Sequence, residues 1–148
     1  MTAHPKPPKR DKKAPNLKRT LKKKLPKAES IRSLVKELDR VFSIHTRMKY
    51  ADEQGMAKCY TCDSVHHWKA MDCGHFFSRR HYSLRWTDEN TKIQCKKCNI
   101  FQAGNQYEFG KRLLAEIGQE RMDILEQRKN NKFKLERGIL KLLINQYK

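Results

Sequence analysis

Apolar side chains recur with a helical period near the start of the chain. In residues 29–54 they are three or four positions apart, with charged side chains such as Glu37 and Asp39 between them. Such a stripe is typical of an amphipathic helix that packs against a core. Gly55 follows, and we expect it to end the helix. The stripe consists of Ile31, Leu34, Val35, Leu38, Val41, Phe42 and Met48.

The C-terminal part of the chain shows the same period with two interruptions. Asn105 and Glu108 have the spacing of a capping box, which predicts a helix that begins there and ends at Gly118. A shorter helix is expected over residues 120–128. A last helix is expected over residues 134–147, with one apolar face formed by Ile139, Leu140, Leu143, Ile144 and Tyr147.

The middle of the chain, residues 58–105, differs from both flanks. It contains all five cysteines, four of the six histidines and both tryptophans. Between His66 and Met71 the side chains alternate in a way that predicts a strand. We therefore expect an α+β domain over residues 29–148, with a central core of residues 58–105 and helices on both sides of it.

Length and charge limit the class of protein. The chain has 148 residues, enough for one compact domain, and its 34 Lys and Arg exceed its 16 Asp and Glu, for a net charge of +18. It has no run of roughly 18 apolar residues that could span a membrane, and no apolar segment follows the basic N-terminus as in a signal peptide. We expect a cytoplasmic protein that binds nucleic acid and no membrane.

The charge is concentrated at the N-terminus. Residues 1–28 contain 11 of the Lys and Arg, all five prolines and a single acid, Asp11. A segment of this composition cannot bury enough apolar surface to fold, so we expect a disordered basic arm. Its function would be to bind phosphates; the alternative is a solubilising tail.

Four cysteines form two pairs with the spacing of zinc knuckles. Cys59 and Cys62 form one pair, and Cys95 and Cys98 form the other. Four thiolates are the ligand set of a closed tetrahedral zinc site, which contributes folding energy and leaves no open position for catalysis. The alternative is disulfides, which are rarer in a cytosolic chain with an odd fifth cysteine, Cys73.

Candidate catalytic residues lie inside and directly after the loop that the zinc would close. Asp72 and His75 lie within the loop, and Asn99 follows the last zinc thiolate, where we expect a helix to begin. An imidazole near an amide or carboxylate oxygen is the chemistry of a one-metal phosphodiesterase. His75 would deprotonate the attacking water, while Mg²⁺ or Mn²⁺, which prefer oxygen ligands, would neutralise phosphate charge.

Each of these residues also has a simpler interpretation. His75 could be a structural histidine, Asp72 a turn-capping carboxylate, and Asn99 a helix cap. Trp68 and Trp86 are expected in the core rather than on a base-stacking surface.

The motifs of residues 58–119 together resemble the NinG/Rap family of phage recombination endonucleases. More broadly they are similar to the zinc-bound branch of the HNH, or ββα-metal, nucleases. The shared motifs are Cys59-x-x-Cys62, Asp72-x-Gly74-His75, Leu84-Arg85-Trp86, Glu89-Asn90, Gln94-Cys95-x-x-Cys98-Asn99 and Gly104-Asn105.

The resemblance implies a zinc-bound ββα-metal core and a Mg²⁺-dependent nuclease of phage or prophage origin, acting in the host cytoplasm. Its substrates would be branched DNA intermediates such as Holliday junctions and D-loops. His75 would be the general base, Asp72 and Asn99 the ligands of the catalytic ion, and Asn90 the residue that holds the loop orienting His75. The four paired cysteines would bind zinc.

This chain departs from the pattern at two places. Gly74 stands where many HNH nucleases have an acid or histidine, and Phe101 begins a stretch where family members often carry a lysine. A cation at the transition state would then come from Arg79 or Arg80, and His81 could also assist at the phosphate. The residues expected to contact DNA are Arg79, Arg80, His81, Arg85, Lys96 and Lys97.

Two other functions and an assembly state complete the predictions. One alternative is a non-catalytic zinc module that binds DNA or RNA, which the positive charge would suit equally well. The other is an adaptor that binds a protein through its last helix, but this function leaves the net charge of +18 unexplained. The apolar faces of the first and last helices also predict a possible homodimer, which would present two sites to a two-fold symmetric junction.

Overall fold

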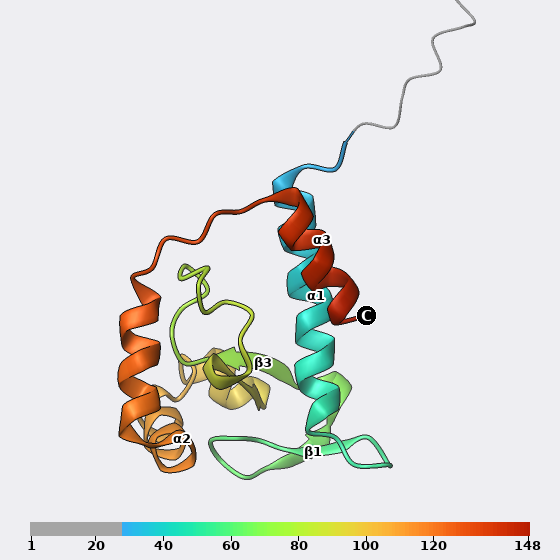
Figure 1. Ribbon diagram of the computed structural model, residues 1–148. Coiled ribbons are helices and arrows are strands. Elements are labelled where there is room, and N and C mark those ends of the chain that lie inside the picture. Colours follow the sequence, from blue (N-terminus) through green and yellow to red (C-terminus); the bar gives the residue numbers. More distant parts are fainter. Residues whose placement is uncertain (1–27) are drawn as a thin grey trace, which may run out of the picture.

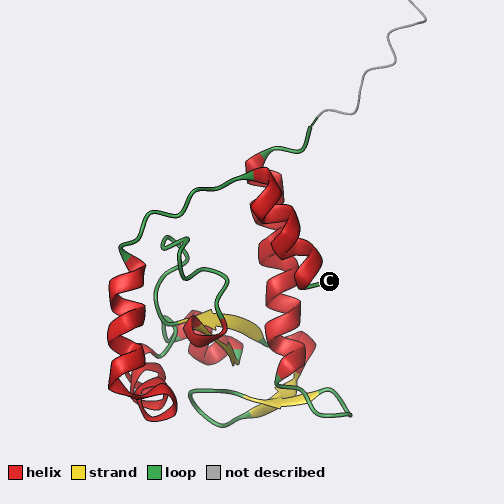
Figure 2. Ribbon diagram, viewed as in Figure 1, coloured by secondary structure: helices red, strands yellow, loops and turns green. Residues whose placement is uncertain are grey.

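The computed structural model describes residues 28–148 as an α+β structure with two small hairpins (Figures 1 and 2). The predicted basic arm lies outside the described residues, apart from Ala28. Among the described helices, none combines the length and apolar character that crossing a membrane requires. The elements in chain order are α1 (Ile31–Lys49), β1 (Met56–Lys58), β2 (Val65–His67), η2 (Trp68–Ala70), β3 (Asp72–His75), η3 (Asp88–Asn90), β4 (Thr91–Gln94), η4 (Lys97–Phe101), α2 (Gln106–Lys129) and α3 (Arg137–Gln146).

Helix α1 confirms the first apolar stripe but ends earlier than predicted. Its N-cap is Ser30, whose hydroxyl accepts a 3.1 Å hydrogen bond from the amide of Ser33. It ends at Lys49, with Tyr50 as its C-cap, so Gly55 is not its stop. Gly55 instead has a φ of 77° in the turn before β1, and its carbonyl accepts a hydrogen bond from the amide of Trp68.

The strand predicted over residues 66–71 is wrong as a single element. Strand β2 ends at His67, whose ring accepts a hydrogen bond from the amide of Lys69 and thereby starts the turn η2. Strand β3 then begins at Asp72. Strands β1 and β2 form one antiparallel hairpin, and β3 pairs antiparallel with β4, with His75 opposite Thr91.

Helix α2 contains the break that the sequence predicts at Gly118. This residue has φ 77° and ψ 167°, and helical backbone resumes directly after it, with no separate loop. The predicted capping box is absent. Asn105 does precede the helix, but with a φ of 45° and no side-chain capping bond, because its amide group lies 3.9 Å from the sulfur of Cys98.

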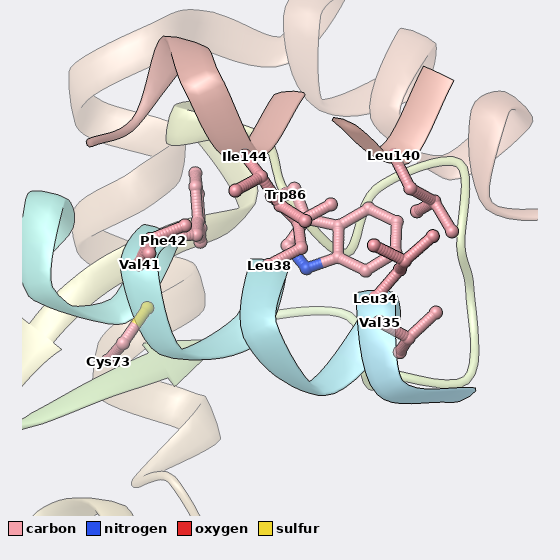
Figure 3. Close-up of a cluster of buried hydrophobic side chains, with 9 residues drawn as sticks. All are labelled: Leu34, Val35, Leu38, Val41, Phe42, Cys73, Trp86, Leu140 and Ile144. Atoms are coloured by element: carbon pink, nitrogen blue, oxygen red, sulfur yellow. The ribbon is translucent and has the colours of Figure 1, made fainter. Parts of the chain in front are cut away.

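Helix α3 packs along α1, at the opposite side of the hairpins from α2 (Figure 1). Leu140 and Ile144 of α3 point toward the side chains of α1, with Trp86 beside them (Figure 3). Most of the two predicted apolar faces is therefore buried within one chain, whereas Met48 and Ile139 are 54% and 40% exposed. The homodimer stays a prediction. Two smaller clusters surround the paired cysteines and the inner face of α2.

Leu140→Ala should lower the free energy of unfolding by about 2–5 kcal/mol, the usual cost of a cavity in a packed core. Leu140 is fully buried, whereas Leu142 on the same helix is 72% exposed and supplies a matched control. Leu142→Ala should change the value by less than about 0.5 kcal/mol. Urea unfolding of both variants checks this, and equal values would contradict the packing of α3 on α1.

Candidate functional site

Four cysteine sulfurs meet at one point between the two hairpins. Cys59 and Cys62 follow β1, Cys95 and Cys98 follow β4, and all four sulfurs lie within 4.8 Å of one another. The sulfurs of Cys62 and Cys95 are 3.7 Å apart. A tetrahedral zinc ion with bonds of about 2.3 Å separates its sulfur ligands by about 3.8 Å, so the cluster could hold one structural zinc.

The backbone of the first knuckle, residues 59–64, forms a tight turn. The amide of Asp63 donates to the carbonyl of Cys59, the amide of Cys59 donates to Ser64, and Asp63 takes a φ of 62°. The amide of Cys95 donates to the Cys59 sulfur at 3.3 Å. Such N–H donors stabilise thiolates, and here they also connect the two knuckles.

Asp63 connects the first knuckle to α2 through hydrogen bonds. Its two carboxylate oxygens accept hydrogen bonds of 2.8 and 2.7 Å from Arg112, and Lys58 lies 3.1 Å away. The bonds from Arg112 and then Lys58 lower the pKa of Asp63. The knuckle is thus held from outside as well as by its sulfurs.

Cys73 is separate from the sulfur cluster. It is buried on β3 against α1, and burial raises the pKa of its thiol to about 11. The fifth cysteine is therefore a core residue with a thiol that stays protonated at neutral pH.

His75 lies at the end of β3 with both ring nitrogens near carbonyl oxygens. Nε2 is 3.0 Å from the carbonyl of Arg85, and Nδ1 is 3.3 Å from that of Cys73. Burial lowers the pKa of His75, which favours the neutral ring with a single N–H. The shorter contact favours the tautomer with the hydrogen on Nε2, which would leave the lone pair on Nδ1.

Asn90 closes the loop that carries the Arg85 carbonyl. Its side chain is fully buried, accepts a 2.7 Å bond from the amide of Phe77, and donates to the carbonyls of Phe77 and Leu84. All hydrogen-bonding groups of the amide are used within the loop. The position of the Arg85 carbonyl, and with it the orientation of His75, depends on these bonds.

Asp39 of α1 holds the same loop from the other side, a role that the sequence did not reveal. Its oxygens accept bonds of 2.9 and 2.6 Å from Arg85 and of 2.9 Å from the indole of Trp86. Burial alone would raise the pKa of Asp39, but these bonds outweigh it and lower the pKa. Asp39 looked like one more charge on a helix surface, because its partners are 46 and 47 positions away.

Asn99 and Asp72 are in contact. The amide of Asn99 donates to Asp72 at 3.2 Å, and the ammonium of Lys96 lies 3.3 Å from the other oxygen of Asp72. Asn99 is the third residue of η4, so it does not begin a helix as predicted. Because side chains alternate along a strand, Asp72 and His75 point to opposite faces of β3.

His75 and Asn99 share a cleft of about 360 Å³. Gln106 lies at its edge and donates a 3.1 Å bond to the carbonyl of His75. Of the predicted catalytic and DNA-contacting residues, the cleft includes His75, Asn99 and Arg79. The full lining is Cys73, His75, Arg79, Asn99, Ala103, Gly104 and Gln106.

Gly74 departs from the nuclease pattern for a packing reason. A Cβ atom at this position would lie 2.0 Å from the side-chain oxygen of Gln94. Gln94 is fully buried and donates to the hydroxyl of Thr61 and the carbonyl of Gly104, which links the first knuckle to the segment after the second. An acidic side chain at residue 74 would therefore require the buried Gln94 side chain to move.

The other predicted DNA contacts have different surroundings. The guanidinium of Arg85 is bound to Asp39 and only 15% exposed, so its side chain serves the fold. A ring nitrogen of His81 lies 2.9 Å from the carbonyl of Lys129 at the end of α2. The remaining predicted contacts, Arg79, Arg80, Lys96 and Lys97, are exposed.

The architecture is that of a small α+β protein in which a cluster of four cysteines, able to bind one zinc ion, lies at the base of a β-hairpin beside a histidine-containing cleft. The family model described as Bacteriophage Lambda NinG protein matches residues 3–148, and the chain belongs to this phage protein family. The resemblance of the sequence to NinG is thus confirmed. Neither a curated protein nor a solved structure matches the chain.

The metal cluster leads to a direct prediction. Cys95→Ser should abolish zinc binding and unfold the centre of the molecule, because sites of this kind supply folding energy. Wild-type protein purified without chelator should contain one zinc per chain. Cys73→Ser is the matched control, since this cysteine lies outside the cluster, and it should keep its zinc. Elemental analysis and circular dichroism measure both; wild-type protein without zinc would contradict the assignment.

Proposed function

We propose that the chain is a structure-selective DNA endonuclease that hydrolyses phosphodiester bonds in branched recombination intermediates such as Holliday junctions and D-loops. The observation that carries the proposal is His75, a half-buried imidazole with Nε2 against a carbonyl, in one cleft with Asn99 and Arg79. Family membership supports a role in phage recombination, and the net charge of +18 supports a nucleic-acid substrate.

His75 would act as the general base. With its hydrogen on Nε2 and bound to Arg85, the imidazole can accept a proton from water only at Nδ1. The contacts of Asn90 and Asp39 hold the loop, so the ring need not reorient during the reaction. Its lowered pKa keeps it unprotonated, and therefore able to accept the proton, at neutral pH.

Of the two predicted ligands, the Asn99 oxygen would hold a catalytic Mg²⁺ or Mn²⁺ in the cleft, and Asp72, which lies outside the cleft, could reach the same ion only by releasing Lys96 or Asn99. Carboxylate and amide oxygens suit both ions, and Asn99 is the member of the pair that lines the cleft. The bound ion would supply charge neutralisation at the phosphate and at the leaving oxygen. The contact with Asp72 orients the Asn99 amide, which leaves its oxygen as the atom free to face the ion.

Arg79 would bind the phosphate at the cleft, and the exposed Arg80, Lys96 and Lys97 would bind the flanking backbone. Arg79 is exposed and forms no ion pair within residues 28–148, so its guanidinium can pair with a phosphate. The four sulfurs would take no part in the chemistry, since a closed tetrahedral site has no position for water.

His75→Ala should reduce Mg²⁺-dependent cleavage of a synthetic four-way junction by roughly 10²–10⁴-fold, the usual contribution of a general base. Zinc content and junction binding should stay unchanged. His66→Ala, an exposed histidine outside the cleft, is the control and should cleave like the wild type. If His75→Ala cleaves normally, or if the wild type binds junctions but never cuts them, the nuclease proposal fails and a non-catalytic zinc module that binds DNA or RNA replaces it.

Asn99→Ala should raise the Mg²⁺ concentration needed for half-maximal cleavage by at least about tenfold, because the cleft loses an oxygen ligand. Gln102→Ala removes a neighbouring exposed amide that does not line the cleft, and it should leave the Mg²⁺ requirement unchanged. Cleavage rates over a Mg²⁺ titration measure both. An unchanged requirement in Asn99→Ala would show that the ion is held elsewhere.

A further inference from the structure

Two aromatic side chains stand out from the surface beside the cleft. Phe101 is 82% and Tyr107 78% exposed, and the adjoining Ile100 is also exposed. Within residues 28–148, neither aromatic ring packs against another ring or joins a buried apolar cluster. Exposed apolar side chains that lie together often mark a binding site. We refer to Ile100, Phe101 and Tyr107 together as the aromatic rim.

The residues of the aromatic rim are sequence neighbours of residues that line the cleft. Phe101 ends η4 two residues after Asn99, and Tyr107 directly follows Gln106. Between Phe101 and Tyr107 in the sequence, Ala103 and Gly104 line the cleft itself. The chain on both sides of these cleft residues therefore carries an exposed aromatic side chain.

The segment that carries Phe101 is fixed to the second knuckle. The amide of Gln102 donates to the carbonyl of Lys97, and the amide of Gly104 donates to that of Cys98, both at 2.9 Å. Gln94 also binds the carbonyl of Gly104. These bonds hold the backbone beside Phe101 against the second knuckle, so this segment loses little backbone freedom when it binds a ligand.

We propose that the aromatic rim stacks on unpaired nucleotides at the branch point of the DNA substrate. Linear duplex DNA hides the faces of its bases, whereas a branch point exposes or loosens them. An aromatic ring stacks on any base face, and apolar side chains can also wedge between loosened base steps. The aromatic rim would therefore select branched over linear DNA, which specifies the substrate class of the proposed nuclease and rests on that function.

The charge around the aromatic rim favours DNA over a protein partner. Arg79, Lys97 and Lys111 are exposed and have no ion-pair partner among the residues that the structure describes. Arg79 lines the cleft, Lys97 begins η4, and Lys111 lies one helical turn after Tyr107. An apolar ring among free cations is the arrangement that single-stranded nucleic acid requires, with stacking for bases and charge for phosphates.

The test measures binding rather than cleavage, in buffer without added Mg²⁺ or Mn²⁺ and at fixed salt. Fluorescence anisotropy gives the Kd of each variant for a labelled four-way junction and for a linear duplex of the same sequence. Phe101→Ala should weaken junction binding by roughly 5- to 150-fold and duplex binding by less than twofold. Phe101→Trp should retain the preference, and Leu142→Ala, an exposed leucine on α3, should bind both DNAs like the wild type.

Several results would overturn the proposal. Equal losses of Phe101→Ala on junction and duplex would reduce Phe101 to a general contact, and no loss would remove it from the interface. A change in molar mass by light scattering in Phe101→Ala would identify the aromatic rim as a contact between proteins. Because no catalytic ion is present, these outcomes do not depend on cleavage. A failed nuclease assay with intact junction selectivity would therefore contradict only the catalytic proposal.

Discussion

The meeting of four cysteine sulfurs is the constraint on which the rest of the structure depends. The sulfurs of Cys62 and Cys95 lie 3.7 Å apart although the residues are 33 positions apart, so one metal ion would close the whole central loop. Closing it fixes the end of β4, and β4 fixes β3 and His75 through their shared hairpin. The same closure sets the start of η4, and with it Asn99 and the aromatic rim. A chain of this size with three small apolar clusters gains much of its order from such a link.

Hydrogen bonds of polar side chains, in addition to the cysteine cluster, hold the loop beside His75. His75 is oriented by a carbonyl of a loop, and that loop is held inside by Asn90 and outside by Asp39. Asp39 belongs to α1, and α3 packs against the apolar side of α1. The packing of α3 therefore influences the cleft through α1 and the carboxylate of Asp39. The geometry of the cleft therefore depends on the cysteine cluster, the hairpin and the first helix together. In this proposal, a zinc ion stabilises the fold and a separate Mg²⁺ or Mn²⁺ ion takes part in catalysis.

The sequence predicted those features that short-range patterns encode. The spacing of the cysteine pairs indicated their cluster, the apolar stripes indicated α1 and α3, and Gly118 indicated the break in α2. Long-range contacts were not predictable: the bonds from Arg85 to Asp39 span 46 positions, and without them Arg85 looked like a DNA contact. The alternation before Asp72 failed as a strand because a histidine side chain captures a backbone amide there and starts a turn. The sequence suggested that Gly74 replaces a metal ligand, but it could not show that Gln94 occupies the space that a side chain at residue 74 would need.

The most direct test of this dependence is an NMR titration of the His75 ring in the zinc-loaded and the zinc-stripped protein. With zinc bound, the half-buried imidazole against the Arg85 carbonyl should titrate below the ordinary histidine pKa of about 6.5. Without zinc, the hairpin loses its anchor and His75 should titrate near that ordinary value. The same lowered pKa in both states would show that the cysteine cluster does not build the cleft, and would contradict the dependence of the proposed active site on the metal.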